Sequence, residues 1–458
     1  MEVAGNVGVE PGAQLGPEGV DVGHDAPGDS KDARVNRAVT RWLRAGGRPR
    51  YLHPAVTPPV SPLLTTHSEL VALVRAIRAG GRLALDTEFV WERTYRPELG
   101  VIQIATDSTV AVIDTVALKD LSALFPVLQD PAIPVVLHGG GQDLEILAVL
   151  MGTPMRGVVD TQVEAAFLGY GLQVGLSALL ERVLKVRIRK DQTYTDWIRR
   201  PLKPEQVVYA EQDVVHLLAM HDQLRVELQR RDRLAWVEEE LRDLEDPARW
   251  APEPDEELYR GVKSWQRLDA RELAVLRSIA AWRERAARRA NIRPNFICND
   301  VVLTTLAARP AETVDELRGV RGLSPGTVDR HGKGLLAAIK EGVACPRDQW
   351  PEPPVRQRRH APPSGLIALL RASVQAVADR EEIAPEVIAS ARDIEGLVEL
   401  STTKSRNGDA EAENRLLHGW RRRLTGETLL QIARGELWIR YDPERREVVG
   451  EPRTPTDR

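Results

Sequence analysis

Two carboxylates, Asp86 and Glu88, interrupt the apolar run LALDTEFV at residues 83–90. Such a run is typical of a buried strand, in which residues two apart project to the same face, about 6 to 7 Å from each other. Two like charges at that separation are costly unless a cation lies between them. The alternative is a strand that ends at Leu85, so that Asp86 caps a turn and Glu88 lies in solvent.

A third carboxylate, Asp143, follows a Gly-rich turn in VVLHGGGQDLEIL, residues 135–147. The pattern predicts a strand, a turn and then a helix whose first turns contain this acid. The helix dipole favours an aspartate at such a position even without a function. This position alone therefore leaves a structural and a functional interpretation open.

The fourth carboxylate is Asp213 in VVYAEQDVVHLL, residues 207–218, where it interrupts the apolar side of a predicted helix. Tyr209 precedes it by four residues, which places the two side chains on one helix face. A buried carboxylate without a partner costs several kcal/mol or takes up a proton. Asp213 therefore needs a partner.

The four acids have no Lys or Arg in their immediate sequence contexts. Oxygen ligands of this kind suit Mg²⁺ or Mn²⁺ better than Zn²⁺. Two such ions about 3.5 to 4 Å apart can hold a phosphodiester, because one activates the attacking water and the other stabilises the leaving 3′ oxygen. We therefore expect a cation, rather than a side chain, to be the partner of the strand acids.

The elements that must position these acids alternate between short apolar strands and helices. The predicted strands are residues 82–89, 101–106, 109–114, 134–139 and 157–161, and the predicted helices are residues 67–80, 141–151, 161–171, 175–184 and 203–231. This order indicates an α/β sandwich. The first three strands are separated by turn-length gaps, which predicts an antiparallel meander.

A Pro-rich and acidic stretch after Asp246 predicts a linker, and the chain beyond it is predicted to be all helical. Two segments there share an I-x-P-x-x-I frame, which indicates two copies of one small helical module. The frames are Ile292, Pro294 and Ile297, and Ile383, Pro385 and Ile388.

The length of 458 residues is enough for two to four domains. The sequence has no apolar run of the roughly 18 residues that a membrane span needs, and its N-terminus lacks the pattern of a secretory signal, so we expect a cytoplasmic protein. Cys298 and Cys345 form neither a disulfide framework nor a zinc-ligand pattern. The net charge of -4 means that any nucleic-acid binding depends on local patches or metal ions.

Three stretches, DTEF, HGGGQDLE and YAEQD, resemble the exonuclease motifs of the DEDD superfamily. Tyr209 marks the tyrosine subclass, since the histidine subclass carries its His one position earlier, where this chain has Val208. The segments IQIA, VVDTQVEAAFLGYGLQVGLSALLERVL and KDQTYTDWIRRPLKPEQVVYAEQDV are similar to ribonuclease D. The two helical modules resemble the HRDC nucleic-acid-binding domain and a weaker second copy of it, while the glycine run in HGGGQD is looser than the family pattern.

The resemblance implies a ribonuclease H-like α/β exonuclease domain, with a mixed central sheet flanked by helices, followed by all-α HRDC modules. The implied organisation is a disordered or linker extension at residues 1–60, a DEDDy exonuclease domain at 61–246, an HRDC domain at 260–343 and a second HRDC-like domain at 364–449.

The implied activity is a metal-dependent 3′–5′ exoribonuclease that trims RNA 3′ ends, such as those of tRNA precursors, and releases nucleoside 5′-monophosphates. Two divalent cations, Mg²⁺ or Mn²⁺, would be held by Asp86, Glu88, Asp143 and Asp213. Tyr209 would orient the attacking water, because a phenol is too weak a base to take the proton unaided at neutral pH.

Five further residues are candidates for contact with nucleic acid. Phe89 is placed to stack on the terminal base, and core packing explains it equally well. His138 ends a buried strand, where a bond to a backbone carbonyl is the favoured interpretation and a place near the scissile phosphate is the alternative. Arg283, Arg288 and Arg289 form a basic stretch that suits phosphate contacts, or a solvated helix face.

Two other functions share the same motifs. A DNA exonuclease of the same superfamily would carry the same acids, and single-stranded DNA remains a possible substrate beside RNA. The lack of a G-x-x-x-x-G-K-[ST] helicase loop favours RNA. A catalytically silent nucleic-acid-binding protein would lack at least one acid, and all four are present with Tyr209. We infer no membrane contact and no obligate protein partner.

Overall fold

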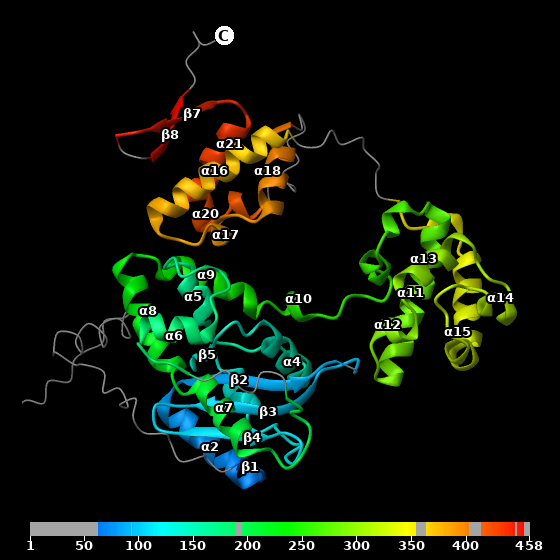
Figure 1. Ribbon diagram of the computed structural model, residues 1–458, viewed down its shortest axis with the longest axis horizontal. Coiled ribbons are helices and arrows are strands. Elements are labelled where there is room, and N and C mark those ends of the chain that lie inside the picture. The colour runs from blue at the N-terminus through cyan, green and yellow to red at the C-terminus, as the bar shows by residue number, and fades with distance from the viewer. Residues whose placement is uncertain are drawn as a thin grey trace, which may run out of the picture. The chain divides into compact units, whose positions relative to one another are not determined.

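The computed structural model describes residues 63–92, 94–188, 195–353, 363–402, 414–444 and 447–452 (Figure 1). The extension predicted for residues 1–60 lies outside the described residues. Among the described helices, none has the length and apolar character that crossing a membrane requires.

A six-stranded mixed sheet forms the centre of the first part of the chain, with strand order β1-β4-β3-β2-β5-β6. The strands β2, β3 and β4 form an antiparallel meander, and the other pairings, β1 with β4, β2 with β5 and β5 with β6, are parallel. The meander and the mixed sheet are therefore confirmed. The bounds are β1 (Leu63–Leu64), β2 (Leu83–Val90), β3 (Glu98–Ala105), β4 (Val110–Asp114), β5 (Val135–Leu137) and β6 (Val158–Asp160).

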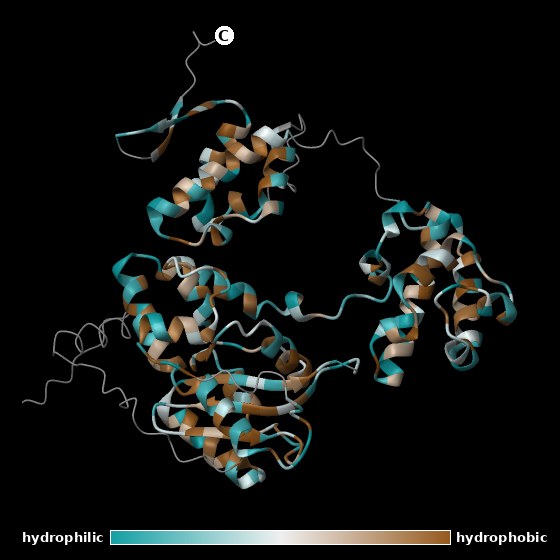
Figure 2. Cartoon of the chain, in the orientation of Figure 1, coloured by the Kyte–Doolittle hydropathy of each residue, from teal (hydrophilic) through white to brown (hydrophobic). Residues whose placement is uncertain are grey.

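Helices cover both faces of this sheet because its strands are apolar on both sides (Figures 1 and 2). One face packs its leucines and isoleucines on α2 (His67–Gly80), α3 (Phe125–Leu128) and α4 (Gly141–Met151). The other face carries α5 (Thr161–Ala166), α6 (Leu176–Val183), α7 (Pro204–Val214), α8 (Leu217–Arg230) and α9 (Leu234–Arg242). The helix α2 has the predicted bounds, since a capping box of Thr66 and Glu69 starts it and Gly81 in the left-handed region ends it.

One predicted helix, residues 203–231, was wrong as a single element. The helix α7 ends at Val214 and α8 begins at Leu217, so His216 lies at the break rather than within the helix of Asp213. No Gly or Pro marks this break in the sequence. The two halves differ in their main packing partners, since α7 packs on β2, β3 and β4, whereas α8 packs mainly on α5.

The next part of the chain is a helical module with its own apolar core. Its long helix α11 (Ala270–Ala290) packs on α13 (Asp300–Ala308) and α15 (Pro325–Val343), with α12 (Pro294–Ile297) and α14 (Val314–Arg318) between them. Before α11 the chain forms η1 (Asp243–Glu245), α10 (Pro247–Trp250), η2 (Leu258–Gly261) and η3 (Trp265–Arg267), and η4 (Arg347–Gln349) follows α15.

The last part repeats this arrangement at its start, where α16 (Ser364–Glu381) is followed by α17 (Pro385–Ile388) as α11 is by α12. The shared I-x-P-x-x-I frame therefore gives the same short helix twice. The chain continues with α18 (Ala391–Thr402), η5 (Arg415–Leu417), α20 (Gly419–Arg421), η6 (Arg422–Gly426) and α21 (Glu427–Ala433).

The all-helical prediction was wrong at the end of this part. The strands β7 (Leu437–Asp442) and β8 (Glu447–Pro452) form an antiparallel hairpin. The stretch LWIRYD contains Trp, Ile and Tyr, which are residue types that favour strands.

Candidate active site

The strand β2 places Asp86 and Glu88 on the face of the sheet that α7 covers. They lie opposite Gln103 and Val101 of β3, and both are half-buried. Val101 packs in the apolar cluster under α7, while Leu85, from the alternate set, packs in the cluster on the other face. The strand therefore continues through both acids, and the alternative that it ends at Leu85 is wrong.

The helix α7 brings Tyr209 and Asp213 to the same region. Its buried residues Val207, Ala210 and Val214 hold it on the sheet, so the two functional side chains lie one turn apart beside that contact and are half-buried. The ring of Tyr209 lies 6.1 Å from that of Trp197, measured between centroids.

The fourth acid, Asp143, lies in the first turn of α4 and is buried. The hydroxyl of Thr87, between the two strand acids, donates a hydrogen bond to its carboxylate. The glycine turn before α4 is held by Asp160, whose carboxylate accepts the backbone N–H groups of Gly139 and Gly140. Gly139 has a φ of 67°, a backbone conformation that favours glycine. The glycine turn, although it departs from the family pattern, is therefore fixed by its hydrogen bonds to Asp160.

Three of the acids converge closely. One carboxylate oxygen from each of Asp86, Glu88 and Asp213 lies within 4.8 Å of the others. Among the described residues, no Lys or Arg forms an ion pair with Asp86 or Glu88. Carboxylate oxygens that converge in this way fit a hard divalent cation in their charge and as donor atoms.

The electrostatics of the acids agree with this interpretation. Burial raises the pKa of Asp86 well above its usual range, and the charges of Asp143, Asp213 and Glu88 raise it further. Burial and the charges of Asp213 and Asp143 raise the pKa of Glu88 to about 8. The pKa of Asp143 is also raised by burial, although the Thr87 hydroxyl opposes the shift.

The segment TDWIRRPL, residues 195–202, is fixed beside Tyr209 by contacts that the sequence did not predict. Arg200 forms an ion pair with Asp114 of β4 at 2.7 Å and donates to the backbone carbonyls of Gly100 and Trp197. A Cβ at Gly100 would lie 2.6 Å from the carbonyl oxygen of Trp197, so this close approach requires glycine. The similarity of this segment to ribonuclease D marked it as important in the sequence. Its contacts could not be predicted, because Gly100 and Asp114 lie on strands that are distant in the sequence.

The two candidate base and phosphate contacts near the acids have different surroundings. His138 is bound within the protein, because Nδ1 contacts the Thr161 hydroxyl and Nε2 contacts the Val174 carbonyl, each at 2.9 Å. Both of its ring nitrogens are thus engaged within the protein, and its place near the scissile phosphate stays a prediction. Phe89 is half-buried in β2 directly after Glu88.

The three candidate arginines of α11 also differ. Arg283 forms an ion pair with Asp300 at 2.8 Å and has a side chain only 12% exposed, so it serves the core of its module rather than a phosphate. Arg288 lies over the ring of Tyr95, 5.7 Å from its centroid, and is exposed on its other side, as is Arg289. Of the three predicted arginines, Arg288 and Arg289 are therefore the two that are exposed to a ligand.

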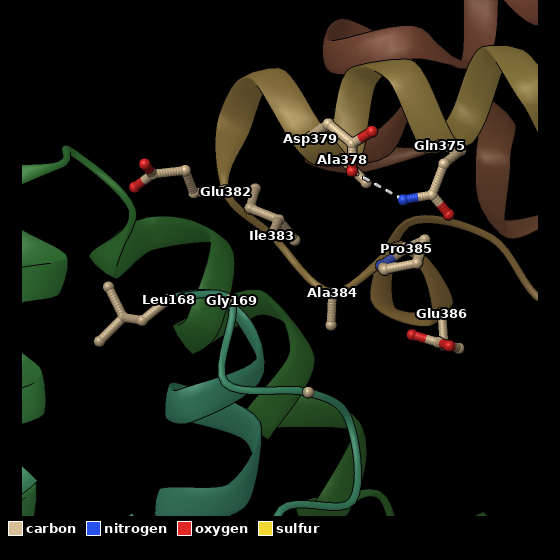
Figure 3. Close-up of a pocket in the computed structure, with 11 residues that line it drawn as sticks. Leu168, Gly169, Gln375, Ala378, Asp379, Glu382, Ile383, Ala384, Pro385 and Glu386 are labelled. Atoms are coloured by element: carbon tan, nitrogen blue, oxygen red, sulfur yellow. Dashed lines mark hydrogen bonds between the residues drawn. The ribbon is translucent and has the colours of Figure 1, made fainter. Parts of the chain in front are cut away.

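A pocket in the described part of the chain lies apart from the acids (Figure 3). The turn containing Leu168 and Gly169 forms one side, and residues of α16 and α17 form the other. None of the four acids lines it, so this pocket is separate from the acidic site.

Comparison with known proteins identifies the family. A model described as 3′-5′ exonuclease matches residues 63–229, one described as HRDC domain matches 272–339, and one described as ribonuclease D, C-terminal HRDC domain, matches 365–429. A ribonuclease D of Granulibacter bethesdensis is 37% identical over 83% of this chain and 95% of its own length. The chain belongs to the ribonuclease D family.

Membership in the ribonuclease D family makes the protein a hydrolytic 3′–5′ exoribonuclease of the DEDD superfamily, which works with divalent metal ions on nucleic acid. The ribonuclease D of Escherichia coli is 33% identical over 80% of this chain and 96% of its own length. The crystal structure of Escherichia coli RNase D, described as an exoribonuclease involved in structured RNA processing, covers 81% of this chain and 98% of its own, with a TM-score of 0.73 and 32% identity. The predicted family, activity class and fold class are thus confirmed.

Proposed function

We propose that Asp86, Glu88, Asp143 and Asp213 hold two divalent cations, Mg²⁺ or Mn²⁺, and that the protein uses them to remove nucleotides from RNA 3′ ends. The observation that carries this proposal is the convergence of carboxylate oxygens from Asp86, Glu88 and Asp213 within 4.8 Å. When bound, the two cations supply activation of the attacking water and stabilisation of the leaving 3′ oxygen.

The residues of the chain position the cations, the scissile phosphate and the attacking water. The strand acids, fixed by the sheet, and Asp213, fixed by α7, place their carboxylates around the scissile phosphate. Thr87 holds Asp143 in position through its hydroxyl. Tyr209, one helical turn from Asp213 and backed by Trp197, orients the attacking water by a hydrogen bond. Hydrolysis with this polarity releases nucleoside 5′-monophosphates.

We propose structured RNA, such as a tRNA precursor, as the substrate. We also propose the cytoplasm as the place of the activity. The relative described as an exoribonuclease involved in structured RNA processing supports this, as do the two HRDC-type matches beyond the exonuclease part. The exposed Arg288 and Arg289 of α11 then contact phosphates of the RNA body, and Phe89 stacks on a base near the 3′ end.

We propose domain bounds of 61–246 for the exonuclease domain, 260–343 for the HRDC domain and 364–449 for the second HRDC-like domain.

A time course on 5′-labelled RNA and DNA of one sequence, with Mg²⁺, Mn²⁺ or EDTA, tests the proposal. We expect a ladder that shortens from the 3′ end of RNA, is stopped by EDTA, and is lost in Asp213→Asn. The matched control is Glu205→Gln, because Glu205 is an exposed acid in the first turn of the same helix. Full activity of Asp213→Asn or activity in EDTA would contradict the proposal, and faster cleavage of DNA would reassign the substrate.

A further inference from the structure

Gln103 lies at the centre of the sheet beneath α7. In β3 it is opposite Asp86 of β2 on one side and Val112 of β4 on the other, and its side chain is fully buried. Residues that oppose each other on antiparallel strands project to the same face, with Cβ atoms about 4.5 to 5.5 Å apart. The amide of Gln103 is therefore a direct cross-strand neighbour of the Asp86 carboxylate.

The side-chain amide of Gln103 forms no hydrogen bond within the described part of the chain. Neither Nε2 nor Oε1 of Gln103 has a hydrogen-bond partner among the described residues. Leaving a buried polar group unpaired costs about 1 to 3 kcal/mol, and native proteins pair nearly all such groups. An apolar side chain would suit the neighbouring Val101 and Val112 better, so the amide indicates a partner on the side of the acids.

The carboxylate of Asp86 needs a donor of this kind. It lies against the charges of three other acids. A carboxylate has about four lone-pair sites, and one that binds a metal ion is usually hydrogen-bonded by a neighbouring group as well. The neutral amide of Gln103 can donate without adding a positive charge that would compete with the cation.

We propose that Gln103 is a positioning residue of the metal site. When the acids hold a metal ion, its Nε2 would donate a hydrogen bond to the Asp86 carboxylate, and this bond would fix the carboxylate for metal binding. The inference rests on the proposed function, because it requires Asp86 to be a metal ligand. It adds to that function a residue that touches neither substrate nor metal.

The test is Mn²⁺ binding by titration calorimetry on the full chain, with thermal unfolding in EDTA as a second readout. The variant Gln103→Met keeps the length of the side chain and removes the amide. We expect it to weaken Mn²⁺ binding about 10-fold or more, the size seen when such supporting groups are lost. Its unfolding temperature in EDTA should equal or exceed that of the wild type, because no unpaired amide remains buried.

The matched control is Val112→Ala, on the other side of Gln103 in the same layer. It should lower the unfolding temperature in EDTA and leave Mn²⁺ affinity unchanged, so it separates packing from positioning. Wild-type Mn²⁺ affinity in Gln103→Met would overturn the inference, and Gln103→Leu serves the same test if the Met variant does not fold. Failure of the wild type to bind Mn²⁺ would instead overturn the proposed function.

Discussion

Thr87, between the two strand acids, is the residue whose removal most sharply tests how Asp143 is held. Its hydroxyl donates to the buried Asp143 carboxylate. The variant Thr87→Val keeps the shape and removes the donor, so we expect a loss of about 1.5 to 3 kcal/mol in the free energy of unfolding measured with urea. Thr87→Ser keeps the hydroxyl and should lose much less. Equal losses in the two variants would contradict this role.

The pKa values of the acids predict that metal binding depends on pH. The pKa of Glu88 is raised to about 8 by burial and by Asp213 and Asp143. A cation binds the ionised carboxylate, so below about pH 8 binding must release a proton and the Mg²⁺ affinity must fall as the pH is lowered. Calorimetry in two buffers of different ionisation enthalpy measures the released protons, and equal heats in both buffers at pH 7 would contradict the prediction.

At the scale of elements, the contact between α5 and α8 contains a buried pair of Glu164 and His221, with His221 Nδ1 2.9 Å from the carboxylate. Burial lowers the pKa of His221, but the charge and hydrogen bond of Glu164 outweigh this and raise it above its usual value. The folded protein therefore binds this proton more tightly than the unfolded chain. Its stabilisation is complete below the usual histidine pKa of about 6.5 and is lost as the pH rises through the folded value.

Unfolding by urea at several pH values should thus show a free energy of unfolding that falls as the pH rises above about 6.5. The variant Glu164→Gln removes the charge that raises the pKa of His221, so this part of the slope should disappear. A slope that is unchanged in Glu164→Gln would show that other groups cause it.

Elements with a strong internal pattern were predictable, and those decided by packing were not. The strands β2 to β6 and the helices α2 and α4 follow from runs of apolar residues with clear periods. The two-residue β1 is too short to carry a period, and the break between α7 and α8 arises from their different packing partners. The four acids stand out in sequence because polar residues are rare in such runs. The supporting contacts of Thr87, Arg200 and Gln103 join distant segments, so no local pattern reveals them.

At the scale of the whole molecule, the C-terminal module contributes to the exonuclease core through Trp420. This fully buried ring stacks on Trp236 of α9 at 5.2 Å and meets Phe167 at 5.1 Å, between centroids. Arg421 adds an ion pair with Glu240 of α9. The module therefore packs as part of the fold, beyond any role in RNA binding.

We expect Trp420→Ala to cost about 3 to 5 kcal/mol, because it leaves a large cavity among buried rings. The control Trp438→Ala removes a ring of the same module that is 54% exposed, and it should cost far less. Calorimetric unfolding and limited proteolysis measure both effects. Equal stability of the two variants would contradict a structural role for the Trp420 contact.

The central claim is that four carboxylates hold two cations, and anomalous scattering from crystals grown with Mn²⁺ and a non-hydrolysable RNA 3′ end tests it directly. The account predicts two Mn²⁺ peaks about 3.5 to 4 Å apart, bounded by Asp86, Glu88, Asp143 and Asp213. A single peak, or peaks bound by other residues while RNA occupies the site, would contradict it.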